Sequence, residues 1–178
     1  MSEINEFARD LVIREIQIYK DNKSKVFDMT QPLSTLLCCA IIIFSDYKEK
    51  FGSDSLIKEM AENDKNHRQS LLSYIERIYK GETNLRLRLA KYYKDKKEEN
   101  DKKIGFLNED YKEYEVFFHD LRNEFAHLIE TNHSKMTPNK DGDFNEVTIE
   151  NCKSEVKLTK DNIIDLIELI YERIDRKE

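Results

Sequence analysis

The stretch that decides the fold is residues 108–130, which read NEDYKEYEVFFHDLRNEFAHLIE. Its large apolar side chains recur three and four positions apart, the spacing that places them on one side of an α-helix. These side chains share the side expected to face a core: Phe117, Phe118, Leu121, Phe125 and Leu128. The pattern predicts one long amphipathic helix that packs against other helices.

Several segments before this one repeat the helical spacing. Apolar residues are spaced for helices at residues 3–20, 30–50, 54–62 and 66–80. Thr30 is expected to cap the second of these helices, and Ser53 or Asp54 the third. Residues 84–100 are also compatible with a helix.

The chain after residue 130 changes character. Residues 146–150 and 155–159 alternate apolar and polar side chains, and residues 151–154 can close a hairpin between them. Thr159 is then expected to cap a last helix with an apolar stripe from Ile163 to Ile174. The fold class predicted is mainly α: a bundle of about five to seven helices. One domain, residues 1–178, is expected, with a small β-hairpin insertion at about residues 145–159, before the C-terminal helix.

The overall composition limits the classes of partner. The chain of 178 residues carries a formal net charge of −6 with both signs mixed, which argues against a uniformly basic nucleic-acid binder. The first ten residues, MSEINEFARD, lack the basic and apolar regions of a signal peptide. The apolar run at residues 36–44 is too short to span a bilayer. We therefore expect a cytoplasmic protein with no membrane partner.

Cysteine and histidine residues show no metal-binding spacing. Cys38 and Cys39 are adjacent, Cys152 makes the count odd, and no CxxC pair occurs, so reduced thiols are expected. The four histidines form no HExxH pattern. We expect neither a metal nor a cofactor.

Residues 84–103 are rich in positive charge. The basic residues of the helical part surround Tyr92 and Tyr93 and are candidates for RNA binding: Arg86, Arg88, Lys91, Lys94, Lys96 and Lys97. Such residues contact phosphate, and neighbouring aromatic rings stack on bases. Interspersed acidic residues leave a second interpretation open, an ordinary solvated helix face.

Polar residues of the 108–130 helix form the candidate catalytic site. Asn123 and His127 are four positions apart and lie on one side of the helix, with His119 and Asp120 nearby as accessory groups. Arg122 lies about 140° from His127 around the axis, so the two do not converge easily within one copy. Two copies facing each other about a two-fold axis would bring both pairs together. Val116 and Ala126 on this side would permit close approach.

A structural interpretation of the same residues stays open. Arg122 can pair with Asp120 or Glu130 within the helix. His127 can be a surface histidine near a helix end, where the helix dipole favours its charged form.

The pattern Arg122-Asn123-x-x-x-His127 resembles the signature of the HEPN superfamily. The resemblance implies a helical bundle, a homodimer with a composite active site, and metal-independent endoribonuclease activity on RNA. It implies catalytic roles for Arg122, Asn123 and His127, in a defence or toxin–antitoxin setting with a protein antitoxin or regulator as partner. The alternative is a non-catalytic helical module that binds RNA, a nucleotide or a protein, as an antitoxin or immunity component does.

The chemistry of these residue types suits RNA cleavage. The ribose 2′-hydroxyl serves as nucleophile, so the reaction does not require a metal. A histidine exchanges protons near neutral pH, and an arginine stays charged and binds phosphoryl oxygens. In this interpretation His127 transfers protons, Arg122 stabilises the phosphoryl charge, and Asn123 orients His127 or contacts phosphate.

The basic stretch gives a first prediction. Charge reversal at Lys94, Lys96 and Lys97 should weaken RNA binding and flatten its dependence on salt, because fewer counterions are released from the phosphates. Filter binding over a series of salt concentrations measures both quantities. Unchanged affinity with an unchanged salt slope would assign the stretch to the solvated face.

Overall fold

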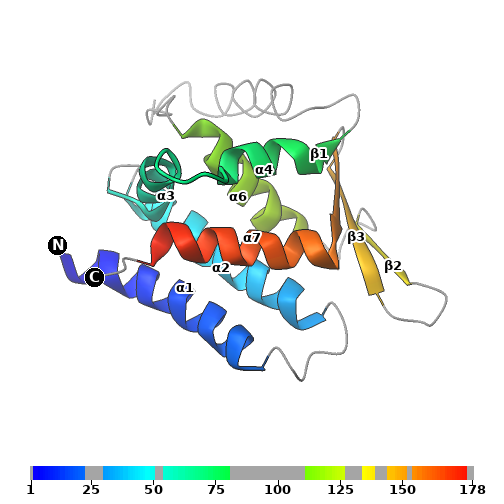
Figure 1. Cartoon of the computed structure of the whole chain (residues 1–178), viewed down its shortest axis with the longest axis horizontal. Helices are drawn as coiled ribbons and strands as arrows, with labels where there is room; N and C mark the ends of the chain where they lie inside the picture. Colours follow the sequence, from blue (N-terminus) through cyan, green and yellow to red (C-terminus); the bar gives the residue numbers. More distant parts are fainter. Residues whose placement is uncertain are drawn as a thin grey trace.

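The computed structural model describes residues 2–22, 30–50, 54–80, 111–126, 134–138, 144–151 and 154–175. Most of these residues are helical, which confirms the mainly α class. The helices are α1 (Ser2–Asn22), α2 (Thr30–Glu49), α3 (Leu56–Asp64), α4 (Leu71–Ile78), α6 (Lys112–Ala126) and α7 (Lys160–Ile174). They form a bundle, and the strands gather at one of its ends (Figure 1).

Helix α7 packs against four of the described helices. It contacts α1, α2, α3 and α4, and its apolar stripe is fully buried at Ile163, Leu166, Ile167, Ile170 and Ile174. The cap predicted for it is confirmed: the Thr159 side chain accepts from the Asn162 backbone, and the Asn162 side chain accepts from the Thr159 backbone. The sequence thus fixes both the start and the buried side of this helix.

The starts of α3 and α4 differ from the prediction. Ser55, and not Ser53 or Asp54, is the N-cap of α3, and its hydroxyl accepts from the Lys58 backbone. The segment expected to be one helix over residues 66–80 is helical only from Leu71 to Ile78. Two side chains cap this start: the Ser70 hydroxyl accepts from the Ser73 backbone, and the Asp64 carboxylate at the end of α3 accepts from the backbone of Leu71 and Leu72.

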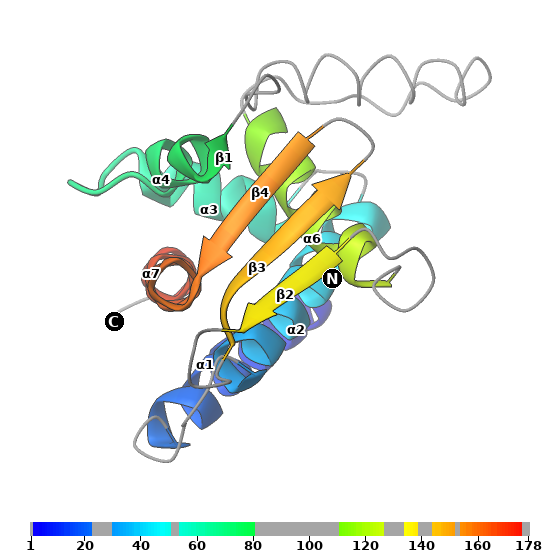
Figure 2. The same cartoon turned by 90° about the vertical axis from the view of Figure 1, so that its right-hand side faces the viewer.

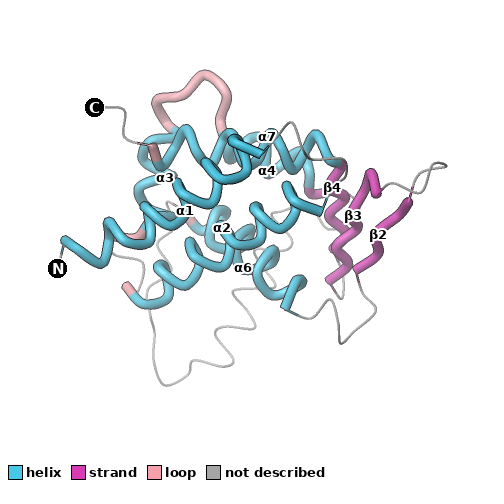
Figure 3. The backbone as a smooth tube through the Cα atoms, turned by 90° about the horizontal axis from the view of Figure 1, so that it is seen from below, coloured by secondary structure: helices cyan, strands magenta, loops and turns pink. Residues whose placement is uncertain are grey.

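The strands form an antiparallel sheet in the order β1-β4-β3-β2. The strands are β1 (Tyr79–Lys80), β2 (Ser134–Pro138), β3 (Phe144–Asn151) and β4 (Ser154–Thr159). The segments predicted to pair, β3 and β4, place Val147 opposite Leu158, and both side chains are fully buried. The sheet is larger than the predicted hairpin, because β1 and β2 extend it on both sides. It stands in front of the helices in Figure 2 and at one end of them in Figure 3.

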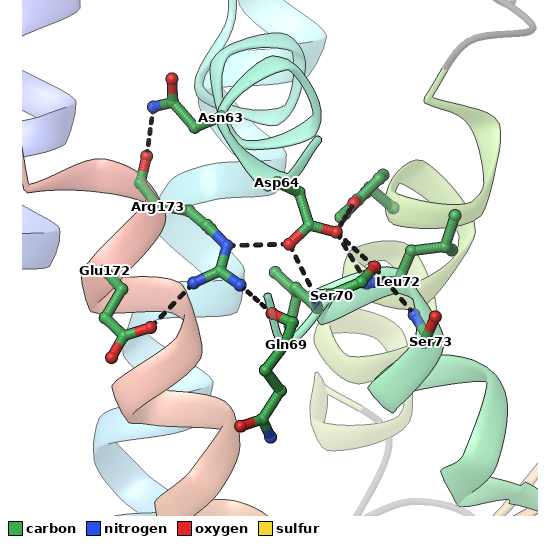
Figure 4. Close-up of polar contacts among 10 residues, drawn as sticks. Asn63, Asp64, Gln69, Ser70, Leu72, Ser73, Glu172 and Arg173 are labelled. Carbon is green, nitrogen blue, oxygen red and sulfur yellow. Dashed lines mark hydrogen bonds and ion pairs between the residues drawn. The ribbon is translucent and has the colours of Figure 1, made fainter. Parts of the chain in front are cut away.

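A buried carboxylate joins four of the helices (Figure 4). Asp64, at the end of α3, accepts five hydrogen bonds: from the side chains of Ser70, Tyr114 and Arg173 and from the backbone of Leu71 and Leu72. The donors come from α4 and the turn before it, from α6 and from α7. We call these residues the Asp64 cluster.

Arg173 supplies the positive charge of the Asp64 cluster. Its side chain is fully buried, and Nε donates to Asp64 Oδ1 over 2.8 Å. The other guanidinium nitrogens donate to the Gln69 carbonyl and to the Glu172 carboxylate. Asn63 also donates to the Arg173 carbonyl, at 2.7 Å. Each guanidinium nitrogen of the buried Arg173 thus donates to an oxygen, and two carboxylates balance its positive charge, as burial requires.

Hydrogen bonding outweighs burial at Asp64. Burial acts to raise the pKa of this carboxyl, but the bonds it accepts, first among them that from Tyr114, hold the pKa well below its ordinary value. The pKa of Tyr114 moves the other way, raised by burial and then by its bond to Asp64. Asp64 is therefore ionised, and Tyr114 remains a donor.

The Asp64 cluster gives a prediction for stability. Asp64→Asn removes the buried anion of Arg173 and leaves only the exposed Glu172 carboxylate beside it, so it should lower the free energy of unfolding at neutral pH by about 3–5 kcal/mol. Urea denaturation measures the loss, with Asp10→Asn as control, since Asp10 is exposed on α1. A loss below about 1 kcal/mol, no larger than that of an exposed pair, would contradict the assignment.

The loss should also depend on pH. The folded pKa of Asp64 lies below the unfolded value of about 3.9, so its stabilisation is fully present above that value and is lost as the pH falls below it. The difference between wild type and Asp64→Asn should therefore shrink below about pH 4. A constant difference across this range would contradict the low folded pKa.

Candidate functional site

Helix α6 is held against α2 by a buried polar contact. The Tyr47 hydroxyl on α2 donates to the Glu115 carboxylate on α6 over 2.7 Å, and both side chains are buried. The ring of Tyr47 also meets the ring of Tyr111 edge to face. One turn earlier on α2, Phe44 contacts His119, which lies one turn later on α6. The two helices therefore run antiparallel, and Tyr114 ties the far side of α6 to the Asp64 cluster.

Most of the described side chains on α6 are buried, and near its C-terminal end a few of the described ones reach the surface. Among the side chains described from residue 117 onward, Arg122 is exposed and His119 and Asn123 are half-buried. We call these three residues the α6 stripe. Val116 is fully buried and Asp120 is 5% exposed. The prediction that Val116 would face a partner copy is wrong, because α2 and β3 both pack on α6 within one chain.

The α6 stripe and Asp120 form one hydrogen-bonded series. Arg122 Nη1 donates to Asn123 Oδ1 over 2.6 Å, and Asn123 Nδ2 lies 2.7 Å from His119 Nε2. His119 Nδ1 lies 3.3 Å from Asp120 Oδ1. The series runs from an exposed cation to a buried carboxylate within a single helix.

The positions of the hydrogens in this series follow from its first member. A guanidinium only donates, so the amide oxygen of Asn123 must face Arg122 and its NH₂ must face His119. The NH₂ group only donates, so His119 Nε2 is the acceptor and the ring proton is on Nδ1. That proton points at Asp120. The arrangement selects one tautomer of the neutral imidazole.

Helix α2 supplies the wall beside the histidine. The rings of Phe44 and His119 are 5.4 Å apart and meet at 71°. Lys48 Nζ lies 5.5 Å from the centre of the same Phe44 ring. The imidazole thus has an apolar neighbour that limits its rotation, and a cation lies one helical turn further along α2.

This arrangement can bind an anion and move a proton. Arg122 is exposed and carries the fork of donors that matches phosphate oxygens. A histidine whose Nδ1–H is held by a carboxylate presents Nε2 for proton transfer, with the carboxylate fixing its orientation. A ligand that displaces the Asn123 amide would meet this nitrogen.

The structure brings together part of the predicted site. Arg122, Asn123, His119 and Asp120 are in one hydrogen-bonded series, and Arg122 donates to Asn123. Asn123 was expected to orient His127; among the described contacts it binds His119. His127 lies outside the residues that the structure describes. The same holds for the basic residues of the segment 81–110, which precedes α6. Their predicted roles stay predictions.

His119 was expected only as an accessory group, and Phe44 and Lys48 were not anticipated. The spacing of four between His119 and Asn123 was visible in the sequence. The burial of Asp120 and the approach of Phe44 depend on packing between elements far apart in the chain, which no local pattern encodes.

No three histidine, cysteine or carboxylate side chains in the described part of the chain are grouped so as to hold a metal ion. Of the helices described, none has the length and apolar character needed to cross a membrane.

No family model matches the chain, and neither the curated proteins nor the solved structures contain a match.

Proposed function

We propose that the protein is a metal-independent endoribonuclease whose active site is built on the α6 stripe. The observation that carries this proposal is the hydrogen-bonded series from Arg122 through Asn123 and His119 to Asp120. An exposed arginine of the type that binds phosphate and an oriented, half-buried imidazole lie within one turn of the same helix, and this supports the proposal. The resemblance of Arg122-Asn123-x-x-x-His127 to the HEPN signature supports the same reaction.

The proposed reaction uses the substrate's own hydroxyl. Arg122 binds the nonbridging oxygens of the scissile phosphate and stabilises the charge that grows on them. One histidine takes the proton of the ribose 2′-hydroxyl, the O2′ atom bonds to phosphorus, and the bond from phosphorus to O5′ breaks. A second histidine gives a proton to O5′. The products are a 2′,3′-cyclic phosphate and a 5′-hydroxyl, and no metal or redox partner enters the balance.

His119 and His127 are the two histidines assigned to these proton transfers. His119 has the orientation that the role requires, through Asp120 on one ring nitrogen and Asn123 on the other. His127 is assigned by the spacing of the motif. Asp120 is a positioning residue, because its contact is with the histidine.

The activity of variants tests the proposal. His119→Ala and His127→Ala should each reduce the rate of RNA cleavage by roughly 10²–10⁴-fold, because each removes one proton transfer. Arg122→Ala should reduce both RNA binding and rate, since it removes a fixed charge. The measurement is gel analysis of labelled RNA in EDTA, and His67→Ala, exposed in the turn after α3, is the control.

Two results would decide against this reaction. Cleavage that stops on adding chelator would show that the chemistry needs a metal, and full activity in both histidine variants would remove them from the mechanism. If no RNA is cut, the alternative of a non-catalytic helical module that binds RNA, a nucleotide or a protein is favoured. The net charge of −6 agrees with a protein partner in that case.

The proposed assembly is a homodimer that brings two α6 stripes together. Because Val116 is buried, we assign the contact to the α6 stripe and to α2, which packs against α6. Ile41 on α2, in the turn before Phe44, is 47% exposed. An exposed large apolar side chain on this helix suits a contact between copies.

Substitution of Ile41 tests this assembly. Ile41→Lys should weaken the dimer at least about tenfold, because it places a charge in an apolar contact. Sedimentation velocity over a concentration series measures the change. Ile18→Lys is the matched control, since Ile18 on α1 is also 47% exposed. A wild-type protein that stays monomeric at every concentration, or equal weakening by both variants, would contradict the proposed interface.

A further inference from the structure

The Asn123 side-chain amide is hydrogen-bonded at both its oxygen and its NH₂ group, to Arg122 and to His119. The oxygen is required by Arg122, which only donates, and the NH₂ group is required by the bare Nε2 of His119. The amide therefore satisfies both neighbours only while the imidazole is neutral.

Protonation of His119 at Nε2 is incompatible with the hydrogen bond that this nitrogen accepts from Asn123. A proton on Nε2 turns that nitrogen into a donor, which then faces the donor NH₂ of Asn123 at a site where the heavy atoms are 2.7 Å apart. Half a turn of the amide about its Cβ–Cγ bond would present the oxygen to Nε2–H. The same turn presents NH₂ to Arg122, which has no acceptor. The bond between Arg122 and Asn123 and the protonated state of His119 therefore exclude each other.

We propose that Asn123 couples the binding of a phosphate group at Arg122 to protonation of His119. A phosphate draws the guanidinium away from Asn123 Oδ1 and frees the amide to turn. The turned oxygen accepts from Nε2–H, while Asp120 continues to accept from Nδ1–H, so the imidazolium is held at both nitrogens. By linkage, protonation of His119 strengthens anion binding by the same factor.

The coupling gives His119 its place in the reaction. The inference rests on the proposed function only in taking RNA phosphate as the natural anion. When that phosphate binds, His119 takes up a proton from the solvent buffer and becomes the acid. O5′ then replaces the Asn123 oxygen as acceptor of the Nε2 proton, the proton passes to O5′ as the bond from phosphorus to O5′ breaks, and the neutral ring is restored. Binding of the substrate thus favours the charged form of the acid.

Charged groups near His119 also act on it through space, and the test must separate this effect. Asp120 and Arg122 flank it on α6, and Glu115 lies one turn earlier on the same helix. Lys48 on α2 shares the Phe44 ring with it. Their through-space effect on His119 does not need the Asn123 amide, whereas the proposed coupling does.

A double-mutant cycle separates the two effects. Arg122→Met removes the charge and the donors but keeps an extended side chain, and Asn123→Ala removes the amide. The state of His119 is followed by NMR of ¹⁵N-labelled histidine side chains over a pH series, in the full chain, with His119→Gln to assign its signals. The whole series is repeated with inorganic sulfate, which remains a dianion throughout, as the probe.

The expected result is a strong dependence on Asn123. Arg122→Met should favour protonation of His119 at least roughly fivefold more when Asn123 is present than in the Asn123→Ala background, the lower end of coupling between linked sites. Sulfate should also favour protonation more in wild type than in Asn123→Ala. Arg14→Met, an exposed arginine on α1, is the control and should leave the signals of His119 in place.

Two outcomes would overturn the proposal. Equal effects of Arg122→Met in the two backgrounds would leave only through-space electrostatics. A neutral His119 with its proton on Nε2 would show that this nitrogen donates to Asn123 and does not accept from it, which is the reverse of the assigned direction. These readouts use no RNA, so coupling without cleavage would overturn the proposed nuclease function alone, and cleavage without coupling would overturn this inference alone.

Discussion

The buried ion pair between Asp64 and Arg173 is the constraint on which the rest of the structure depends. Its partners are 109 residues apart in the chain, and the carboxylate also accepts from α4 and α6. Removing two charges from water is costly, and their attraction compensates only when the remaining donors and acceptors are satisfied. The five bonds at Asp64 meet this condition and fix how α3, α4, α6 and α7 meet.

This constraint determines which part of α6 reaches the surface. Tyr114 binds one side of the helix to Asp64, and Glu115 binds Tyr47 on α2. With both sides held, His119, Arg122 and Asn123 remain open beyond the aromatic segment. The same packing buries Asp120 directly beside His119. The buried position of the carboxylate that orients the imidazole therefore follows from how the helices pack.

Local patterns in the sequence predict those features that depend on neighbouring residues. The helical periodicity, the Thr159 cap and the pairing of residues 146–150 with 155–159 are of this kind. The start of α4 has a local signal that the prediction missed, since Ser70 accepts from the Ser73 backbone. It also has a contribution that helical spacing does not show, the Asp64 carboxylate of the preceding helix. Strand β1 has only two residues, and its pairing with β4 spans more than seventy positions. Val116 was placed on the wrong face because periodicity does not tell how many neighbours surround a helix.

The candidate site shows the same division between local and distant contributions. His119 and Asn123 are four positions apart, so their contact follows from helical spacing. Arg122 and Asn123 are adjacent, and their contact depends on the conformation of the two side chains. The Phe44 wall and the buried state of Asp120 come from packing. Neither could be read from the 108–130 segment. In the coupling that we propose, one amide joins an exposed arginine to an imidazole, and three residues would link anion binding to proton transfer.

The measurement that tests the central claim most directly is the identification of the ends left on cleaved RNA. Phosphorus NMR and end-specific enzymes applied to the products of one defined oligoribonucleotide distinguish the alternatives. Attack by the ribose 2′-hydroxyl predicts 2′,3′-cyclic phosphate and 5′-hydroxyl ends, with no cleavage when the ribose at the scissile position is 2′-deoxy. Products with 5′-phosphate ends, or cleavage of the 2′-deoxy substrate, would show that water is the nucleophile and would contradict the account.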